Sequence, residues 1–364
     1  MNKMIGSAVC VTAALILLSG CRSKVTQNED QVREVSSFSN LCNNGELYMD
    51  NDKTVFCDFI SMTAAPLCSK PNCPHNNEKI CSAYNMYGVP FLYNEKIYYF
   101  VSDAIDNGDK TFSDITDVYI SDTDGTNRSV VKTIKDLCPE EGSNMFIVGN
   151  ELYLFAVKHN FSEYGGYGSE QTKEVRFCKF DLTDYSLTDI ALLGTDYSNS
   201  SYFLGVFNGS IYFNYSYLEE PDVDFENTDY KHKEYKYDLK SGEISDNDVD
   251  NLHMISGGWI IIKNGSGCIM RNEKGEEITL EENYSDFDCI VNDIAFSGYY
   301  GYCVDLKSGK KYSLDFGGEN SQNSRYTVKD HIDVRYIVGV QNYAENSREY
   351  ISFTEDELIG EEIK

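Results

Sequence analysis

Three cysteines and one histidine near the N-terminus are the group of residues whose types and spacing point most directly to chemistry. Cys68, Cys73, His75 and Cys81 give the pattern C-x4-C-x-H-x5-C, with two prolines between them that stiffen the loop. Three thiolates and one imidazole form a donor set that suits tetrahedral Zn²⁺. Because four protein ligands leave no position for water, the pattern predicts a structural zinc site and argues against catalysis there.

A disulfide is the alternative for the same residues. Two of the three cysteines would then bond to each other, the third would pair with Cys42 or Cys57, and His75 would cap a turn. The spacing differs from the usual C-x2-C knuckles, which favours the disulfide, whereas three cysteines plus a histidine favour the metal. Across the whole chain, which has 12 cysteines, we expect at most two disulfides.

The first residues indicate where in the cell the protein is located. Lys3 precedes an apolar run of about fifteen residues, which is short for a bilayer-spanning helix, and the run ends at Leu18-Ser19-Gly20-Cys21. This is typical of a bacterial lipobox, so we expect residues 1–20 to be a cleaved signal peptide and Cys21 to be lipidated. The alternative is an uncleaved N-terminal anchor. Multiple acyl chains would hold the chain on the extracytoplasmic face of the cell membrane.

Composition and charge limit the domain organisation and the partners expected for the rest of the chain. Residues 21–39 are polar and poor in aromatics, which predicts a flexible tether, and residues 40–364 are expected to form the folded domain. The formal net charge is −28. Such a charge repels phosphate backbones, so nucleic acid is excluded as a partner, and a protein or small-molecule ligand is expected instead.

Two short phrases recur along this predicted domain. A turn signal followed by alternating aliphatic and aromatic residues recurs at intervals of 49 to 59 residues, near residues 47, 97, 152, 211 and 260. A strand that ends in Asp-Leu before a tight turn occurs at residues 181, 238 and 305. Both phrases predict an all-β fold, a β-propeller of about seven (six to eight) four-stranded blades, with a two-domain β-sandwich as the alternative.

The hairpins with Asp-Leu-x-Ser-Gly and Asp-x-Asp-Gly-x-Asn resemble the repeats of TolB-like and related receptor-type propellers. The phrase from Pro66 to His75, followed by Cys81, resembles the first blade of a set of Gram-positive bacterial lipoproteins that carry such a propeller. The resemblance implies the propeller fold and the membrane location. It brings no established activity with it.

Location and fold together predict a lipid-anchored module that binds or scaffolds a protein or small ligand. One alternative is a glycan lyase or hydrolase on a propeller scaffold, although the sequence contains no convincing catalytic set. The other is an envelope sensor whose cysteine cluster responds to redox state or metal. Tyrosines, of which there are 28, are candidates for a binding rim, namely Tyr164, Tyr167, Tyr212, Tyr215 and Tyr217.

Overall fold

The structure is a computed structural model, and it describes residues 32–36, 39–42, 44–50, 52–76, 81–84, 90–106, 112–140, 143–159, 172–219, 230–280, 287–316, 324–332, 334–343 and 347–363. These residues are almost entirely β-strand, and the helix among them is the single turn α2 (Glu355–Leu358). None of the described helices is long and apolar enough to cross a membrane. The expected signal peptide and Cys21 lie outside the described residues.

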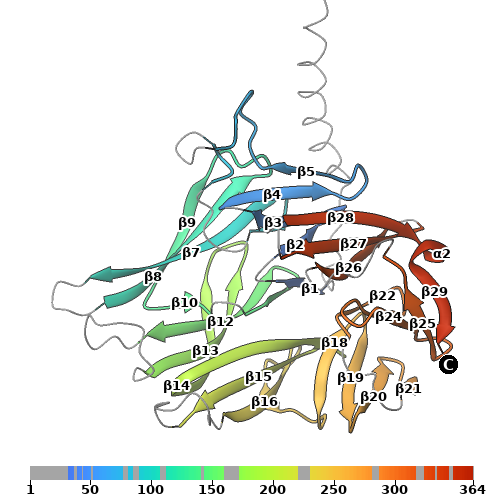
Figure 1. Ribbon diagram of the computed structural model, residues 1–364. Coiled ribbons are helices and arrows are strands. Elements are labelled where there is room, and N and C mark those ends of the chain that lie inside the picture. The colour runs from blue at the N-terminus through green and yellow to red at the C-terminus, as the bar shows by residue number, and fades with distance from the viewer. Residues whose placement is uncertain are drawn as a thin grey trace, which may run out of the picture. The chain divides into compact units, whose positions relative to one another are not determined.

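The chain divides into two compact units, which we describe one at a time. Figure 1 labels the strands of both. Unit 1 comprises residues 1–203 and 214–233, and unit 2 comprises residues 204–213 and 234–364.

Unit 1 contains two four-stranded antiparallel sheets near the start of the chain. The first has the order β2-β3-β4-β5 and the second the order β6-β7-β8-β9. Their strands are β2 (Ser39–Cys42), β3 (Gly45–Asp50), β4 (Lys53–Asp58), β5 (Thr63–Pro66), β6 (Phe91–Tyr93), β7 (Lys96–Asp106), β8 (Phe112–Asp122) and β9 (Ser129–Lys135).

A nine-stranded sheet follows, in the order β1-β11-β12-β13-β14-β15-β16-β17, with β10 paired to β12. The 21-residue strand β14 serves two blades, so this sheet counts as two. Its strands are β1 (Val32–Val35), β10 (Cys138–Pro139), β11 (Met145–Val148), β12 (Glu151–His159), β13 (Thr172–Asp181), β14 (Leu187–Phe207), β15 (Ser210–Leu218), β16 (Lys231–Asp238) and β17 (Ile244–Asp246).

Strand β1 corrects the expected tether. Val32–Val35 pairs antiparallel with Met145–Val148, and Val35 is fully buried in the core of unit 1. The tether prediction is therefore wrong for residues 32–35, and the folded part begins before residue 40. Sequence reasoning missed this strand because its two central residues, Arg33 and Glu34, are charged and make a four-residue segment look polar. Residues 21–31 lie outside the described part.

Unit 2 contains three further antiparallel sheets, in the orders β18-β19-β20-β21, β22-β23-β24-β25-β29 and β26-β27-β28. Their strands are β18 (Leu252–Ser256), β19 (Trp259–Asn264), β20 (Gly267–Asn272), β21 (Glu277–Leu280), β22 (Cys289–Val291), β23 (Ile294–Ser297), β24 (Tyr302–Asp305), β25 (Lys310–Leu314), β26 (Ser324–Ile332), β27 (Arg335–Asn342), β28 (Ser347–Thr354) and β29 (Ile359–Ile363).

These small sheets are the blades of a seven-bladed β-propeller, so the predicted fold class is confirmed. Within each sheet the strands mostly follow one another along the chain, as in a meander, and the β-sandwich alternative is wrong. Three blades depart from the expected four strands in the described ranges. The blade of β11 to β14 gains β1 at its edge and the short strand β10, which pairs with β12. The sheet of β22 to β25 gains β29 as a fifth strand, and the sheet of β26 to β28 has three.

The first recurrent phrase makes two-residue hairpin turns. Asn208 and Gly209 have φ of 48° and 72°, and Asn94 and Glu95 have φ of 46° and 59°. Positive φ at both central positions gives a type I′ turn, whose twist matches that of the flanking strands. Each turn therefore sets the register of the strand that follows it, which explains the regular recurrence of the phrase along the chain.

The second phrase makes a turn that its own aspartate caps. In one copy, the carboxylate of Asp238 accepts hydrogen bonds from the backbone N–H groups of Lys240 and Ser241, at 3.0 and 2.6 Å. The N–H of Gly242 donates to the Asp238 carbonyl at 2.9 Å, and Gly242 has a φ of 72°. Hydrogen bonding thus favours Asp238 at the start of the turn, and the positive φ favours Gly242 at its end.

Candidate metal centre

The four predicted metal ligands lie in one loop that is anchored at both ends to the same residue. Residues 67–84 follow β5, and within them the N–H of Leu67 donates to the carbonyl of Thr54 on β4 at 2.9 Å. The N–H of Thr54 donates in turn to the carbonyl of Ala83 at 2.9 Å. Thr54, Leu67 and Ala83 are all buried. Thr54 therefore holds the two ends of the loop next to each other at its base.

Inside the loop, the backbone is held in conformations that turn the ligands toward one another. Asn72 and His75 have positive φ of 56° and 51°. A left-handed conformation costs an ordinary L-residue about 1–2 kcal/mol, so these conformations need support from their surroundings. The hydroxyl of Tyr84 supplies part of it by donating to the carbonyl of His75 at 3.0 Å.

The turn between β8 and β9 supports the loop from outside. Arg128 on this turn donates through Nη2 to the carbonyls of Ser82 and Tyr84, at 2.7 and 3.2 Å. Gly125 on the same turn has a φ of 75°, and a Cβ there would lie 2.5 Å from the carbonyl oxygen of Leu67. Sequence analysis did not identify Arg128 or Gly125 as part of the site, because nothing in their local pattern distinguishes them from other turn residues.

The side chains of the predicted quartet converge. The ligand atoms of Cys68, Cys73, His75 and Cys81 all lie within 4.8 Å of one another, and His75 Nδ1 is 3.3 Å from Cys81 Sγ. Zinc bond lengths place two ligand atoms of a tetrahedral site about 3.5–3.8 Å apart. Cys81 is 4% exposed and the other three are half-buried. The donor set and its spacing therefore fit a closed four-ligand zinc site.

The thiols of this cluster differ in acidity. Burial raises the pKa of Cys68, but hydrogen bonds from Ser82 and from the backbone at Lys70 outweigh it, and the pKa falls to about 7. Burial, together with the neighbouring thiols Cys68 and Cys73, raises the pKa of Cys81 to about 11. One thiol is thus prepared to become a thiolate near neutral pH, whereas Cys81 needs a cation to lose its proton.

The disulfide alternative is not what the structure contains. Cys68, Cys73 and Cys81 are thiols that form no disulfide, with each other or with Cys42 or Cys57. His75 does not cap a turn through its ring in the contacts described; its Nδ1 faces Cys81 Sγ. The described cysteines of the cluster are therefore unbonded thiols, and the four converging side chains could hold a metal ion.

The proposed tyrosine rim is wrong for Tyr212 and Tyr215, which are buried, whereas Tyr217 is half-buried. Tyr212 and Tyr215 are 4% and 0% exposed, and Tyr215 donates its hydroxyl to Asp196 Oδ2 at 2.6 Å inside unit 1. Tyr164 and Tyr167 lie outside the described residues. Among the described residues, the most exposed tyrosines lie in loops of unit 2. They are Tyr299, Tyr300 and Tyr343.

Comparison with known proteins shows no family for this chain. No protein-family model matches the chain, and no curated protein matches it. Among solved structures, similar chains include an oligogalacturonate lyase in complex with manganese, with 10% identity, a TM-score of 0.45, and coverage of 89% of this chain and 90% of that one.

Two further solved structures are similar at the same level. The β-propeller domain of the Trilobed protease from Pyrococcus furiosus has 11% identity and a TM-score of 0.39, with coverage of 91% of this chain and 97% of that domain. Porphyromonas gingivalis dipeptidyl peptidase 4 has 11% identity and a TM-score of 0.40, and 60% of its chain is covered by 89% of this one. Function therefore has to be argued from the residues of this chain.

Proposed function

We propose that this chain is a lipid-anchored extracytoplasmic β-propeller that works as a binding or scaffolding module, and that its first blade is locked by a structural Zn²⁺. Cys68, Cys73, His75 and Cys81 hold the ion. The observation that carries the zinc assignment is the convergence of three sulfurs and one imidazole nitrogen within 4.8 Å of one another. When bound, the ion supplies charge and a rigid cross-link to the loop.

The module assignment rests on different observations. The fold offers a propeller scaffold, and no group of residues at the zinc cluster is left to act on a substrate once all four donors hold the ion. The strongly acidic chain, with a net charge of −28, favours a cationic ligand or a basic protein surface as the partner. The N-terminal Leu-Ser-Gly-Cys motif supports attachment through Cys21.

Metal analysis of the purified full-length protein tests the zinc assignment. The variant Cys81→Ser should carry one equivalent of zinc fewer than the parent protein, as measured by elemental mass spectrometry. The matched control is Cys289→Ser, because Cys289 is a partly exposed cysteine outside the cluster whose Sγ donates to the carbonyl of Val328, a bond that serine retains. Equal zinc content in the parent and in Cys81→Ser would refute the assignment.

Labelled palmitate tests the anchor in bacterial cells that express the full chain. The parent protein should incorporate the label and sediment with membranes, and Cys21→Ser should do neither. Cys68→Ser is the control, because its thiol lies in the folded part and should not change acylation. Incorporation of label into Cys21→Ser at the parent level would contradict the lipid anchor.

A redox-responsive sensor is a second candidate, and the acidity of Cys68 favours it. A thiol with a pKa of about 7, close to two further sulfurs, is chemically suited to oxidation followed by disulfide formation. Under this alternative, dilute peroxide should release zinc and link two of the three cysteines, and a thiol reductant should reverse both. Retention of zinc in peroxide would leave the structural role and exclude the sensor.

A further inference from the structure

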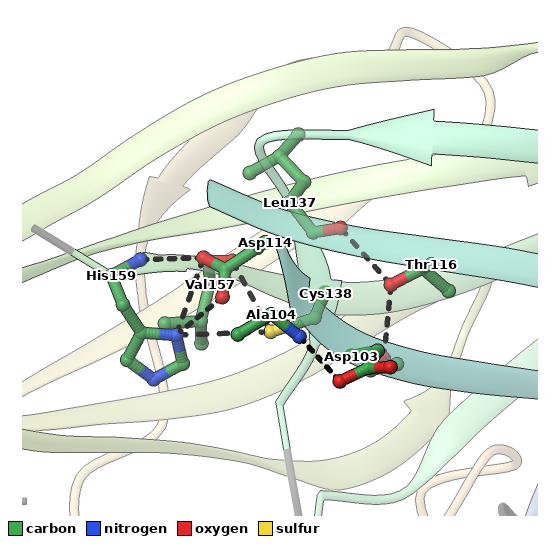
Figure 2. Close-up of polar contacts among 9 residues, drawn as sticks. Asp103, Ala104, Asp114, Thr116, Leu137, Cys138, Val157 and His159 are labelled. Atoms are coloured by element: carbon green, nitrogen blue, oxygen red, sulfur yellow. Dashed lines mark hydrogen bonds and ion pairs between the residues drawn. The ribbon is translucent and has the colours of Figure 1, made fainter. Parts of the chain in front are cut away.

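A second group of metal-ligating side chains lies in unit 1, on strands that are far apart in sequence. Asp114 is near the start of β8, Cys138 begins β10, and His159 ends β12. Strand β10 pairs with β12 so that Cys138 lies opposite Val157, two residues before His159. Figure 2 shows the three side chains gathered at one point between these strands. Neither the sequence motifs nor the zinc cluster accounts for them.

The donor atoms of this group are as closely gathered as those of the zinc cluster. One donor atom from each of Asp114, Cys138 and His159 lies within 4.8 Å of the others. His159 Nδ1 is 3.1 Å from Asp114 Oδ1, 3.3 Å from Asp114 Oδ2 and 4.0 Å from Cys138 Sγ. A carboxylate oxygen, a thiol sulfur and an imidazole nitrogen are all ligands that zinc and similar divalent ions accept.

A cysteine, a histidine and an aspartate also suggest a nucleophilic triad, but the geometry argues against one. In a triad the carboxylate bonds to one imidazole nitrogen while the nucleophile faces the other, so that the proton moves across the ring. Here both Asp114 and Cys138 face the same nitrogen, Nδ1 of His159. Three donors that converge on one point are arranged for an ion between them and not for a proton relay.

We propose that Asp114, Cys138 and His159 form a second metal site, which binds Zn²⁺ or a similar borderline divalent ion and keeps one coordination position open. The carboxylate and the thiolate together balance the double positive charge, so the occupied site is electrically neutral. Cys138 releases its proton to solvent when the ion binds, and His159 binds the ion through Nδ1 as a neutral imidazole with its proton on Nε2. A tetrahedral ion with three protein ligands has a fourth position for water or a small anionic ligand.

Burial supports this assignment. Asp114 and Cys138 are 6% and 9% exposed, so the site places a carboxylate and a thiol largely out of water. Such burial is costly for a carboxylate unless a cation or several donors compensate it. The side chain of His159 is 34% exposed and forms the solvent side of the cluster. The open position of a bound ion is therefore accessible from the side of His159.

The surrounding hydrogen bonds position two of the three donors. The backbone N–H of His159 donates to Asp114 Oδ2 at 2.8 Å, which fixes the carboxylate against the end of β12. The hydroxyl of Thr116 donates to the carbonyl of Leu137 at 3.1 Å and lies 2.9 Å from Ser102 Oγ. This holds the backbone next to Cys138 (Figure 2). Supporting contacts of this kind orient ligands in metal sites.

Cobalt titration of the full-length protein in detergent tests the inference, because Co²⁺ replaces Zn²⁺ and its thiolate charge-transfer absorption reports each cysteine ligand. The parent should bind two equivalents and His159→Gln one. The cobalt affinity of the second site should fall at least about 100-fold in His159→Gln. Cys138→Ser should lose the charge-transfer contribution of the second site, and Asp114→Asn should weaken cobalt binding at that site. His232→Gln, an exposed histidine outside both clusters, is the control and should keep two equivalents.

The second site depends on neither the zinc cluster nor the proposed function, and the titration separates them. If only the second site exists, Cys81→Ser binds one equivalent, like the parent, and His159→Gln binds none. One equivalent in both the parent and His159→Gln overturns the inference. So does a cobalt spectrum that azide leaves unchanged in Cys81→Ser, because an open position must accept a small anion. Far-ultraviolet circular dichroism of His159→Gln, which changes a partly exposed side chain, establishes that the variant is folded.

Discussion

The two clusters of unit 1 use similar donors in different ways. The zinc cluster takes three sulfurs and one nitrogen from a single loop of fourteen residues, 68 to 81. The second cluster takes one sulfur, one nitrogen and one carboxylate from three strands, at residues 114, 138 and 159. As proposed, the first would surround an ion completely, and the second would leave one position open. Ligand number thus separates a site that cross-links the chain from a site that can bind a further molecule.

The difference also lies in what folds the site. The loop of the zinc cluster is anchored at its base by Thr54, and beyond that base its turns carry positive φ at Asn72 and His75. The second cluster sits where β8, β10 and β12 are already fixed by strand pairing and by the packed core around them. An ion should therefore stabilise the first cluster strongly and the second only slightly.

The largest predicted effect is a difference in stability between a variant of the zinc cluster and a variant of the second cluster. Cys81→Ser should lower the free energy of unfolding of the zinc-loaded protein by more than about 2 kcal/mol, because a bound ion is lost and a buried residue of the loop loses its ligand role. His159→Gln should lower it by less than about 1 kcal/mol. Thermal unfolding in the presence of zinc measures both. A chelator should lower the midpoint of the parent to that of Cys81→Ser.

The reverse order of these two variants would break the comparison. If His159→Gln destabilises the protein more than Cys81→Ser does, the second cluster is the structural one and the zinc cluster is not. Cys289→Ser again serves as the control for the effect of replacing a cysteine as such.

The two clusters also differ in how far they could be predicted from the sequence. Cys68, Cys73, His75 and Cys81 were found because a short loop leaves its ligand pattern readable in the sequence, and the structure brings all four together. Asp114, Cys138 and His159 carry no pattern, because β-strand pairing and not sequence spacing brings them together. The second site becomes visible only when the register of β10 against β12 is known.

The fold was predictable for the opposite reason. Each blade repeats the same turn chemistry, such as Asn208-Gly209 at a type I′ turn and Asp238 with Gly242 at a capped turn, so many weak local signals agree. Single segments fared worse. Val32–Val35 forms a strand although half of it is polar, and Tyr212 and Tyr215 are buried although tyrosine is common at binding surfaces. In both cases tertiary contacts override what a short stretch of sequence favours.

A smaller effect is expected from a residue that positions the second cluster without touching an ion. Thr116→Val keeps the side-chain shape but removes the hydroxyl that donates to the carbonyl of Leu137. The cobalt affinity of the second site should fall about 10-fold, because the backbone at Cys138 is held less firmly. The zinc cluster should keep its affinity.

Thr133→Val is the matched control for this prediction. Thr133 lies on the exposed strand β9 and donates to Asp117 Oδ1 at 2.5 Å, and neither residue belongs to a cluster. Equal cobalt affinities in Thr116→Val and the parent would show that β10 does not need this hydrogen bond to present Cys138.

The smallest effect concerns the order in which the metal-free thiols react. Cys68 has a pKa of about 7, below the ordinary 9.0, whereas that of Cys81 is about 11. At pH 7 about half of Cys68 is thiolate, against about one in ten thousand for Cys81. Iodoacetamide should therefore label Cys68 before Cys81, and the labelling rate of Cys68 should rise from pH 6 and level off near pH 8.

The two pKa shifts change the stability of the metal-free protein in opposite directions as the pH rises. The lowered pKa of Cys68 adds stability as the pH rises from 7 to 9, and the raised pKa of Cys81 removes it as the pH rises from 9 towards 11. The thermal midpoint should therefore peak near pH 9 without zinc, and Cys68→Ser should remove the rising limb only. Equal labelling of Cys68 and Cys81 at pH 7 would mean that the Ser82 hydrogen bond does not lower the pKa of Cys68 below that of Cys81.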